Sequence, residues 1–380
     1  MNLRRSAILI LALLSLPLLS SCVRVLNPSG WSAVVFDGNT AYLTTSKGKI
    51  SSVTVDGDSA TANWTFPDKD RKEDDNLNLK AIYGTPILDG DRLYLGTFNG
   101  GVFALRTDDG RPIWPGVDGN AQKIGGNLAG GIVMAGDKLF FGTTEGRLYG
   151  WKKADGTPAP GWEEPKKLNG GIWAAPVVVG DAVFAATTDG GLHAFSTSDG
   201  HEIWSGFKAS GAVLELSAIN DDLLFVPSIN HHIYLVKTAD GSIAADFKAN
   251  NWIWSNGAVS DGKLFFGDFS GTVFGLDISG STITPLWDPV KLDGEHVRAA
   301  PAIIGDVLVV ADRKPVVTFI NIKDGTVMGN RVPLQDAGTV RADLVVRDGA
   351  AYISTTNGKL FRAEPDNLRV VEVVLSGVKK

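Results

Sequence analysis

One pattern of turns and short apolar segments recurs along most of this 380-residue chain and limits the folds open to it. Its clearest copy runs from Gly84 to Trp114. Three residue pairs that favour tight turns divide this copy: Asp89-Gly90, Asn99-Gly100 and Asp109-Gly110. The segments between the pairs are rich in β-branched, aromatic and aliphatic residues, so the pattern predicts four short strands joined by three tight turns.

The segment expected to form the third strand recurs eight times, at intervals of about 40 to 52 residues. The copies begin at Gly48, Gly100, Gly146, Gly190, His231, Gly271, Pro315 and Gly358. Each follows a hairpin that is apolar on both faces, as expected for strands covered by neighbouring sheets. Tandem four-stranded units of this length are typical of a β-propeller, whereas one coil of a solenoid, the alternative, is shorter. The sequence predicts an all-β fold, an eight-bladed β-propeller of four-stranded antiparallel blades.

Several units end in an aromatic residue at the close of the expected fourth strand. These residues are Trp64, Trp114, Trp162, Trp204, Phe247 and Trp287. An aromatic ring at a fixed position in each repeat predicts a packing wedge between adjacent sheets.

The N-terminus has the features of a secretory signal for a lipoprotein. Arg4 and Arg5 precede an apolar run that is too short to be read as a membrane-spanning helix. The run ends in Leu19-Ser20-Ser21-Cys22, which resembles a bacterial lipobox whose cysteine receives the lipid. Cys22 is the only cysteine, so no disulfide can form within the chain. We expect Cys22 to be lipidated; the alternative is an ordinary signal with an incidental thiol.

These signals predict three segments: a signal peptide over residues 1–21, a lipidated tether over 22–30 and one eight-bladed propeller domain over 31–380. The ring is expected to close where the chain ends share a blade, with Arg369–Leu375 and Val23–Leu26 as candidate strands. Val23 is not the aspartate that retains some lipoproteins in the inner membrane. We expect an exported protein anchored at the periplasmic face of the outer membrane in a host with two membranes, and otherwise at the outer face of the cytoplasmic membrane.

Composition and motifs give no sign of catalysis or of nucleic-acid binding. The net charge of −6 comes with no cluster of Lys and Arg. There is no GxSxG, Walker or HExxH motif, and the five histidines lack metal-ligand spacing. We expect no catalytic, cofactor-binding or metal-binding residues, and no cofactor.

One position differs informatively between the units. It lies three residues before the position that Pro86 occupies, where the chain approaches each innermost strand, and we call it the lead-in position. Around the ring it is occupied by Trp31, Tyr83, Ala129, Trp173, Leu214, Trp254, Arg298 and Arg341. In a propeller this position borders the mouth of the central channel. The two arginines are therefore expected to be neighbours, with Trp254 on one side and Trp31 on the other.

Two interpretations of this ring remain open. The side chains can plug the channel, with arginine stacked on tryptophan for stability alone. Alternatively they form a recognition face, because aromatic residues and arginine are enriched in binding hot spots and paired guanidinium groups can hold a carboxylate. Trp252 and His296 would extend that face. The predicted partner-binding set is Trp31, Tyr83, Trp173, Trp252, Trp254, His296, Arg298 and Arg341.

The repeat resembles that of the PQQ-like (pyrroloquinoline-quinone-like) β-propeller family, whose typical third strand reads LYALDAxTGKxxW. Trp114 and Trp204 match the terminal tryptophan of that motif, and the resemblance covers residues 31–375. One branch of the family contains quinoprotein dehydrogenases, which use a quinone and calcium and often carry a vicinal cysteine pair or a haem domain. This chain has neither feature, and its lead-in ring offers apolar residues where acidic ligands would be expected.

The other branch contains non-catalytic envelope lipoproteins similar to the outer-membrane protein assembly factor BamB, and chain length, lipobox and unit count favour it. The resemblance implies a lipid-anchored envelope scaffold, a monomeric propeller that binds envelope protein partners through its loops, with a role in outer-membrane protein assembly. Two alternatives remain: a PQQ-dependent quinoprotein oxidoreductase, and an extracytoplasmic propeller that binds a small molecule or glycan.

Overall fold

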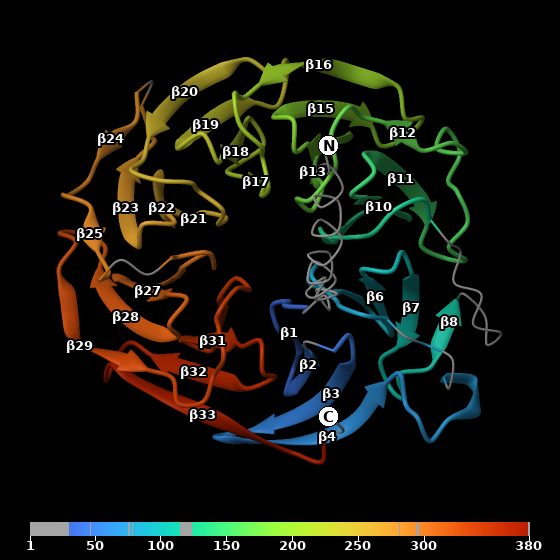
Figure 1. Ribbon diagram of the computed structural model, residues 1–380, viewed down its shortest axis with the longest axis horizontal. Coiled ribbons are helices and arrows are strands. Elements are labelled where there is room, and N and C mark those ends of the chain that lie inside the picture. The colour runs from blue at the N-terminus through green and yellow to red at the C-terminus, as the bar shows by residue number, and fades with distance from the viewer. Residues whose placement is uncertain are drawn as a thin grey trace, which may run out of the picture.

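The computed structural model describes residues 30–378 except 46, 75, 76, 78, 115–123, 281, 294 and 295. Cys22 and the segment Val23–Leu26 lie outside the described residues. Eight groups of antiparallel strands surround a central axis, and the chain visits them in order round the ring (Figure 1). The predicted all-β fold, an eight-bladed β-propeller, is confirmed. None of the described residues belongs to a helix long and apolar enough to cross a membrane.

The first four blades follow one another from β1 to β16. Blade 1 contains β1 (Val35–Asp37), β2 (Thr40–Thr44), β3 (Ile50–Asp56) and β4 (Ser59–Phe66), and the short 3-10 helix η1 (Lys72–Asp74) follows it. Blade 2 contains β5 (Ile87–Asp89), β6 (Arg92–Gly96), β7 (Val102–Arg106) and β8 (Pro112–Trp114). Blade 3 contains β9 (Ile132–Ala135), β10 (Lys138–Gly142), β11 (Arg147–Lys152) and β12 (Lys166–Lys167). Blade 4 contains β13 (Val177–Val179), β14 (Ala182–Ala186), β15 (Gly191–Ser196) and β16 (Glu202–Lys208).

The last four blades contain β17 to β33. Blade 5 contains β17 (Ser217–Ala218), β18 (Leu223–Pro227), β19 (His232–Lys237) and β20 (Ile243–Lys248). Blade 6 contains β21 (Ala258–Ser260), β22 (Lys263–Gly267), β23 (Thr272–Asp277) and two short outer strands, β24 (Thr284–Pro285) and β25 (Val290–Lys291). Blade 7 contains β26 (Ala302–Ile304), β27 (Val307–Ala311), β28 (Val316–Asn321) and β29 (Val327–Pro333). Blade 8 contains β30 (Val345–Arg347), β31 (Ala350–Ser354), β32 (Leu360–Glu364) and β33 (Arg369–Ser376).

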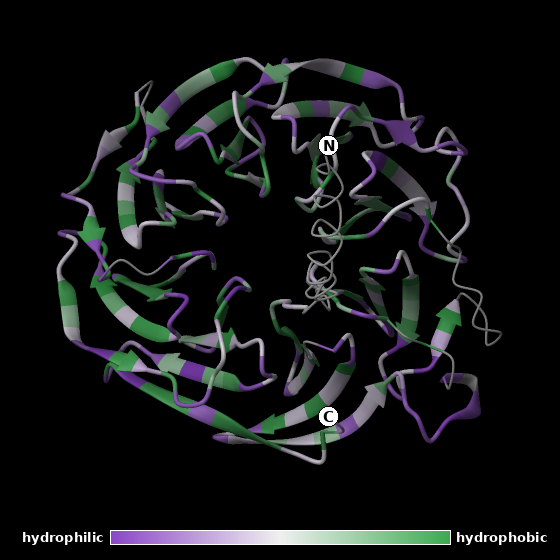
Figure 2. Cartoon of the chain, viewed as in Figure 1, coloured by the Kyte–Doolittle hydropathy of each residue, from purple (hydrophilic) through white to green (hydrophobic). Residues whose placement is uncertain are grey.

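Apolar side chains are buried between blades. In the described residues they form eight clusters, each of which is shared by two neighbouring blades. In one cluster, for example, Tyr42 and Phe66 of blade 1 pack with Leu93 and Phe103 of blade 2. Figure 2 shows apolar residues along the strands and a hydrophilic loop at the rim after β4. The core of this protein is therefore a ring of interfaces rather than a single centre.

Four of the five terminal tryptophans join successive blades by one shared contact, as the wedge prediction requires; the exception is Trp162, whose Nε1 has no hydrogen-bond partner among the described residues. The ring of Trp64, at the end of blade 1, lies against Gly110 in a turn of blade 2, and its Nε1 donates a 2.8 Å hydrogen bond to the carbonyl of Thr107. The same contact with the next blade is made by Trp114, Trp204 and Trp287, whose Nε1 atoms donate to Lys153, Thr238 and Ile322. Each of these blades is thereby fixed to its successor by apolar packing and a hydrogen bond.

The ring closes differently from the expectation. β33 completes blade 8 as its own outer strand, and its other edge pairs in parallel with β4 of blade 1, from Val374 with Ser59 to Ser376 with Thr61. Blades 8 and 1 therefore form one continuous eight-stranded sheet. The outer strands β4 and β33 are eight residues long, which brings their edges together beyond the blades. Arg362 crosses the seam and donates to Asp58 at 2.7 Å.

We predict that Gly110→Ala destabilises the protein more than Gly90→Ala. Both glycines have positive φ, 68° and 58°, so both substitutions carry the same backbone penalty of about 1 kcal/mol. A Cβ at Gly110 would also lie 2.4 Å from Cε3 of Trp64, whereas nothing lies within 4 Å of a Cβ at Gly90. Forcing the tryptophan aside should add about 1–3 kcal/mol, measurable by urea unfolding. Equal losses in the two variants would show that the wedge contact contributes nothing.

Candidate functional site

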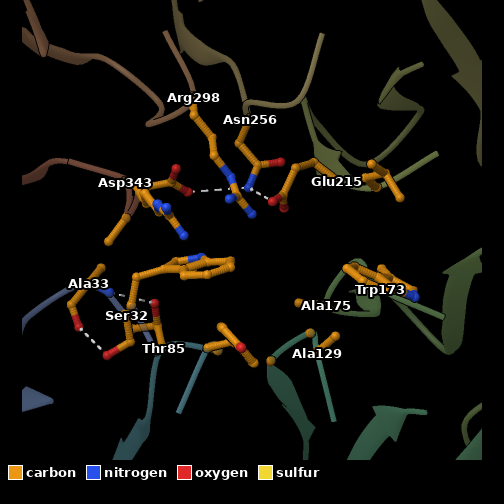
Figure 3. Close-up of a pocket in the computed structure, with 18 of the residues that line it drawn as sticks. Ser32, Ala33, Thr85, Ala129, Trp173, Ala175, Glu215, Asn256, Arg298 and Asp343 are labelled. Atoms are coloured by element: carbon orange, nitrogen blue, oxygen red, sulfur yellow. Dashed lines mark hydrogen bonds between the residues drawn. The ribbon is translucent and has the colours of Figure 1, made fainter. Parts of the chain in front are cut away.

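The segments that lead into the innermost strands meet at the centre of the ring and enclose a cavity of about 280 Å³. All eight lead-in positions line it: Trp31, Tyr83, Ala129, Trp173, Leu214, Trp254, Arg298 and Arg341. Figure 3 shows side chains from separate blades, among them Trp173, Glu215 and Arg298, turned toward this space. The repeat alignment thus places the ring correctly, because equivalent positions of eight blades face one axis.

Arg298 lies between two tryptophan rings at one side of the cavity. Its guanidinium carbon is 4.2 Å from the ring centroid of Trp31 and 3.9 Å from that of Trp254. The guanidinium carbon of Arg341 also approaches Trp31, at 4.9 Å. An indole face attracts a cation through its negative potential. This arginine–tryptophan stack joins lead-in residues of blades 6, 7, 8 and 1, across the seam of the ring.

The stack brings a positive charge into the cavity. Burial lowers the pKa of Arg298 to about 10, an effect that Glu215 opposes and Arg341 reinforces. Burial also lowers the pKa of Arg341. A guanidinium with a pKa of about 10 stays charged at neutral pH, so the cavity contains a fixed cation. Arginine stacked on tryptophan is the arrangement that the plug interpretation expects. The role of these residues in partner binding stays a prediction.

Trp252 and His296 lie beside the cavity rather than in it. Both contact Phe269, whose ring centroid is 6.2 Å from that of Trp252 and 4.6 Å from that of His296. Phe269 also stacks on Trp254, at 5.8 Å and 10° between the ring planes. Trp252 is 47% exposed. The predicted set therefore divides into six residues around the cavity and two on an adjoining aromatic surface, which Phe269 connects.

Three polar residues that the sequence analysis did not identify also face the cavity, and we call them the acidic group: Glu215, Asn256 and Asp343. The amide Nδ2 of Asn256 donates to Glu215 Oε2 at 3.4 Å and to Asp343 Oδ2 at 3.2 Å (Figure 3). Asp343 Oδ1 accepts a 2.7 Å hydrogen bond from the backbone N–H of Ala300. Asn256 Oδ1 is shielded from solvent and has no hydrogen-bond partner among the described residues.

The sequence contained a signal for these residues. Asn256 and Asp343 stand two residues after lead-in positions, where the other six units have Ala33, Thr85, Gly131, Ala175, Leu216 and Ala300. Glu215 stands one residue after a lead-in position, where the other seven have Ser32, Gly84, Gly130, Ala174, Ser255, Ala299 and Ala342. The lead-in positions themselves hold no acidic residue, but the cavity that they line does, so the argument from one position in each unit does not extend to the channel mouth.

The protein environment favours the protonated forms of Glu215 and Asp343. Burial, together with the charge of Asp343, raises the pKa of Glu215 to about 8, while Arg298 opposes the rise. Burial raises the pKa of Asp343 as well, against hydrogen bonds from Ala300 and Asn256. Both carboxylates keep some accessible surface, but they line the cavity and are otherwise enclosed by protein. Glu215 therefore holds a proton at neutral pH.

The described residues contain no group of three or more His, Cys, Asp or Glu side chains that could hold a metal ion. The two acids of the cavity instead offer hydrogen-bond acceptors opposite aromatic walls. Such a site can bind a ligand that carries a positive charge or several hydroxyl groups.

The repeated four-stranded blades and the cavity at their axis define a β-propeller of the PQQ-like repeat class. The chain belongs to the family described as outer membrane protein assembly factor BamB, which it matches over residues 23–120, 116–219 and 208–379. The resemblance seen in the repeats is confirmed. No curated protein matches this chain by sequence.

Solved structures share the fold at low sequence identity. The computationally designed protein Ika8 is 13% identical with a TM-score of 0.68, over 88% of this chain and 95% of its own. BamB from Moraxella catarrhalis is 17% identical with a TM-score of 0.64, over 92% and 95%. The WD40 propeller domain of Doa1 is 13% identical with a TM-score of 0.54, over 77% and 93%. At these identities the likeness establishes the propeller fold alone.

We predict that the free energy of unfolding falls as pH rises from about 4.5 to 8, and that Glu215→Gln reduces this fall. The pKa of Glu215 is 4.5 in a model peptide and about 8 in the fold, so the folded state binds the extra proton in this window. The fall should be about 2–4 kcal/mol, followed by urea unfolding at pH 5, 7 and 9. The exposed acid Glu164 supplies the control Glu164→Gln. If the free energy of unfolding of Glu215→Gln depended on pH as that of the parent does, the raised pKa of Glu215 would be contradicted.

Proposed function

We propose that this protein is a non-catalytic, lipid-anchored scaffold of the cell envelope that recognises partner proteins at the mouth of its propeller channel. Membership of the BamB family supports a protein-interaction scaffold in general. The observation that carries the proposal is the convergence of aromatic residues and arginines from six blades on one cavity: Trp31, Tyr83, Trp173, Trp254, Arg298 and Arg341. Residues of these types dominate binding hot spots.

The two exposed tryptophans are the residues best placed to contact a partner. Trp173 lines the cavity and is 39% exposed, and Trp252 on the adjoining aromatic surface is 47% exposed. Large exposed aromatic side chains bury much apolar area when a partner covers them. Arg298 is already held between two indole rings, so its role here is to keep Trp31 and Trp254 in position.

The envelope location rests on the sequence and on the family. The lipobox ending at Cys22 supports a lipid anchor, and the family description names outer-membrane protein assembly. A single acyl chain binds a membrane only marginally, so stable anchoring requires the additional acyl chains of a lipoprotein or a protein partner. We place the protein at the periplasmic face of the outer membrane where the host has one, and otherwise at the outer face of the cytoplasmic membrane.

We predict that the double substitution Trp173→Ala and Trp252→Ala abolishes capture of an envelope protein without changing the thermal midpoint of unfolding. Neither ring belongs to one of the buried interblade clusters, so their loss should spare the fold. The measurement is native mass spectrometry of complexes purified from the host envelope, followed by binding assays with the purified partner. Ile243→Ala on the outer strand β20, where the side chain is 51% exposed, is the matched control. Capture that survives the double substitution, or is lost equally in the control, would refute the channel mouth as the binding face.

A second candidate is the quinone-dependent oxidoreductase, which one observation favours. Glu215, Asn256 and Asp343 place oxygen atoms of the kinds that calcium prefers beside Arg298. Only two of these groups are carboxylates, and the described residues form no three-acid site. We expect no quinone absorbance and no dye reduction with alcohols or sugars after incubation with calcium and pyrroloquinoline quinone. Turnover that is lost in Asp343→Asn would establish the oxidoreductase and overturn the scaffold.

A further inference from the structure

The acidic group is an unusual feature at the centre of the ring. Its three members come from blades 5, 6 and 8 and meet only because the ring is closed. Among the described residues Glu215 receives one hydrogen bond, at 3.4 Å, and Asn256 Oδ1 receives none. Carboxylate oxygens enclosed with so few hydrogen bonds can accept more, and a ligand can supply the donors.

We propose that this cavity binds a primary ammonium group, held by the carboxylates of Glu215 and Asp343. An ammonium group has three N–H donors and no acceptor, which suits two carboxylates that line one space. The alkyl chain next to the ammonium group lies along the aromatic walls. Trp173 contributes one of these walls, with an accessible ring.

The charges nearest to Glu215 and Asp343 leave room for one more cation. Glu215 and Asp343 carry two negative charges when ionised, and the enclosed guanidinium of Arg298 supplies one positive charge. Arg341 lies farther out, against Trp31, and less deeply buried. In the absence of ligand the remaining charge is neutralised by the proton on Glu215, and an ammonium ion replaces that proton when it binds.

Aromatic walls favour an organic cation over a metal ion. Calcium and magnesium prefer six or more oxygen ligands, and the described residues provide no cluster of three acids. Tyr83, Phe98 and Trp173 line the same cavity, and ring faces attract ammonium groups while covering the attached hydrocarbon. The ligand is either a free alkylamine or a lysine side chain that a partner inserts. The inference does not depend on the proposed scaffold function, because a free amine needs no partner protein.

The test is isothermal titration of the isolated full-length protein with 1-pentylamine and with its neutral counterpart 1-pentanol. We expect 1-pentylamine to bind one per chain and about tenfold or more tightly than 1-pentanol. Glu215→Gln and Asp343→Asn should each weaken amine binding about tenfold or more, whereas the exposed substitution Glu164→Gln should leave it unchanged. Trp173→Leu, which leaves both acids in place, should weaken it severalfold and serves if an acid variant fails to fold.

Proton release provides a readout that an incidental surface site would not give. Glu215 faces Asp343, Arg298 and Asn256, and its proton must leave before the ammonium group binds. Below a pKa of about 8, amine affinity should therefore rise about tenfold per pH unit. Titrations in buffers of different ionisation enthalpy should show about one proton released per amine at pH 7. Both effects should disappear in Glu215→Gln.

Two further ligands distinguish a free amine from a lysine side chain of a partner protein. Tighter binding of 1,5-diaminopentane indicates a free diamine, and tighter binding of Nα-acetyl-lysine methylamide indicates a partner's lysine; either result supports the ammonium site. Equal affinity for 1-pentanol, displacement of the amine by micromolar calcium chloride or millimolar glucose, or amine binding unchanged in both acid variants would overturn it.

Discussion

Closure of the ring is the constraint on which the rest of this structure depends. Each blade buries its faces against its two neighbours, and the eight apolar clusters of the described residues all lie between blades. An open ring would therefore expose two apolar faces and two strand edges together. The seam between blades 8 and 1 must be fixed as firmly as the other interfaces, although the chain does not connect them.

The seam is fixed by strand pairing between blades, which the other interfaces of the described residues lack. Terminal tryptophans of blades 1, 2, 4 and 6 dock on the next blade, but blade 8 ends in RVVEVVLS with no aromatic residue. At the rim, parallel pairing of β33 with β4 takes the place of the wedge. At the axis, Arg298 and Arg341 of blades 7 and 8 lie against Trp31 at the start of blade 1. The seam is thus held at both its outer and its inner end.

The sequence predicts those features that depend on position within one repeat. The wedge role of Trp64 and the lead-in ring follow from aligning equivalent residues, because symmetry gives equivalent residues equivalent surroundings. The mode of closure could not be read in the same way, since it depends on how far β4 and β33 extend beyond their blades. Phe269 was missed because it lies in a turn, where the direction of a side chain is not set by strand alternation.

The acidic group was missed because its members depart from the repeat instead of following it. Asp343 and Glu215 occupy positions where the other units have small or uncharged residues, so the propeller fold itself does not require a carboxylate there. Enclosing two acids and a guanidinium costs free energy that a small apolar residue would avoid. Stacking on tryptophan offsets part of this cost for Arg298, whereas Glu215 receives only one long hydrogen bond from the described residues. A role in binding would explain why these residues depart from the repeat at a cost to stability, and this supports the ammonium site that we propose.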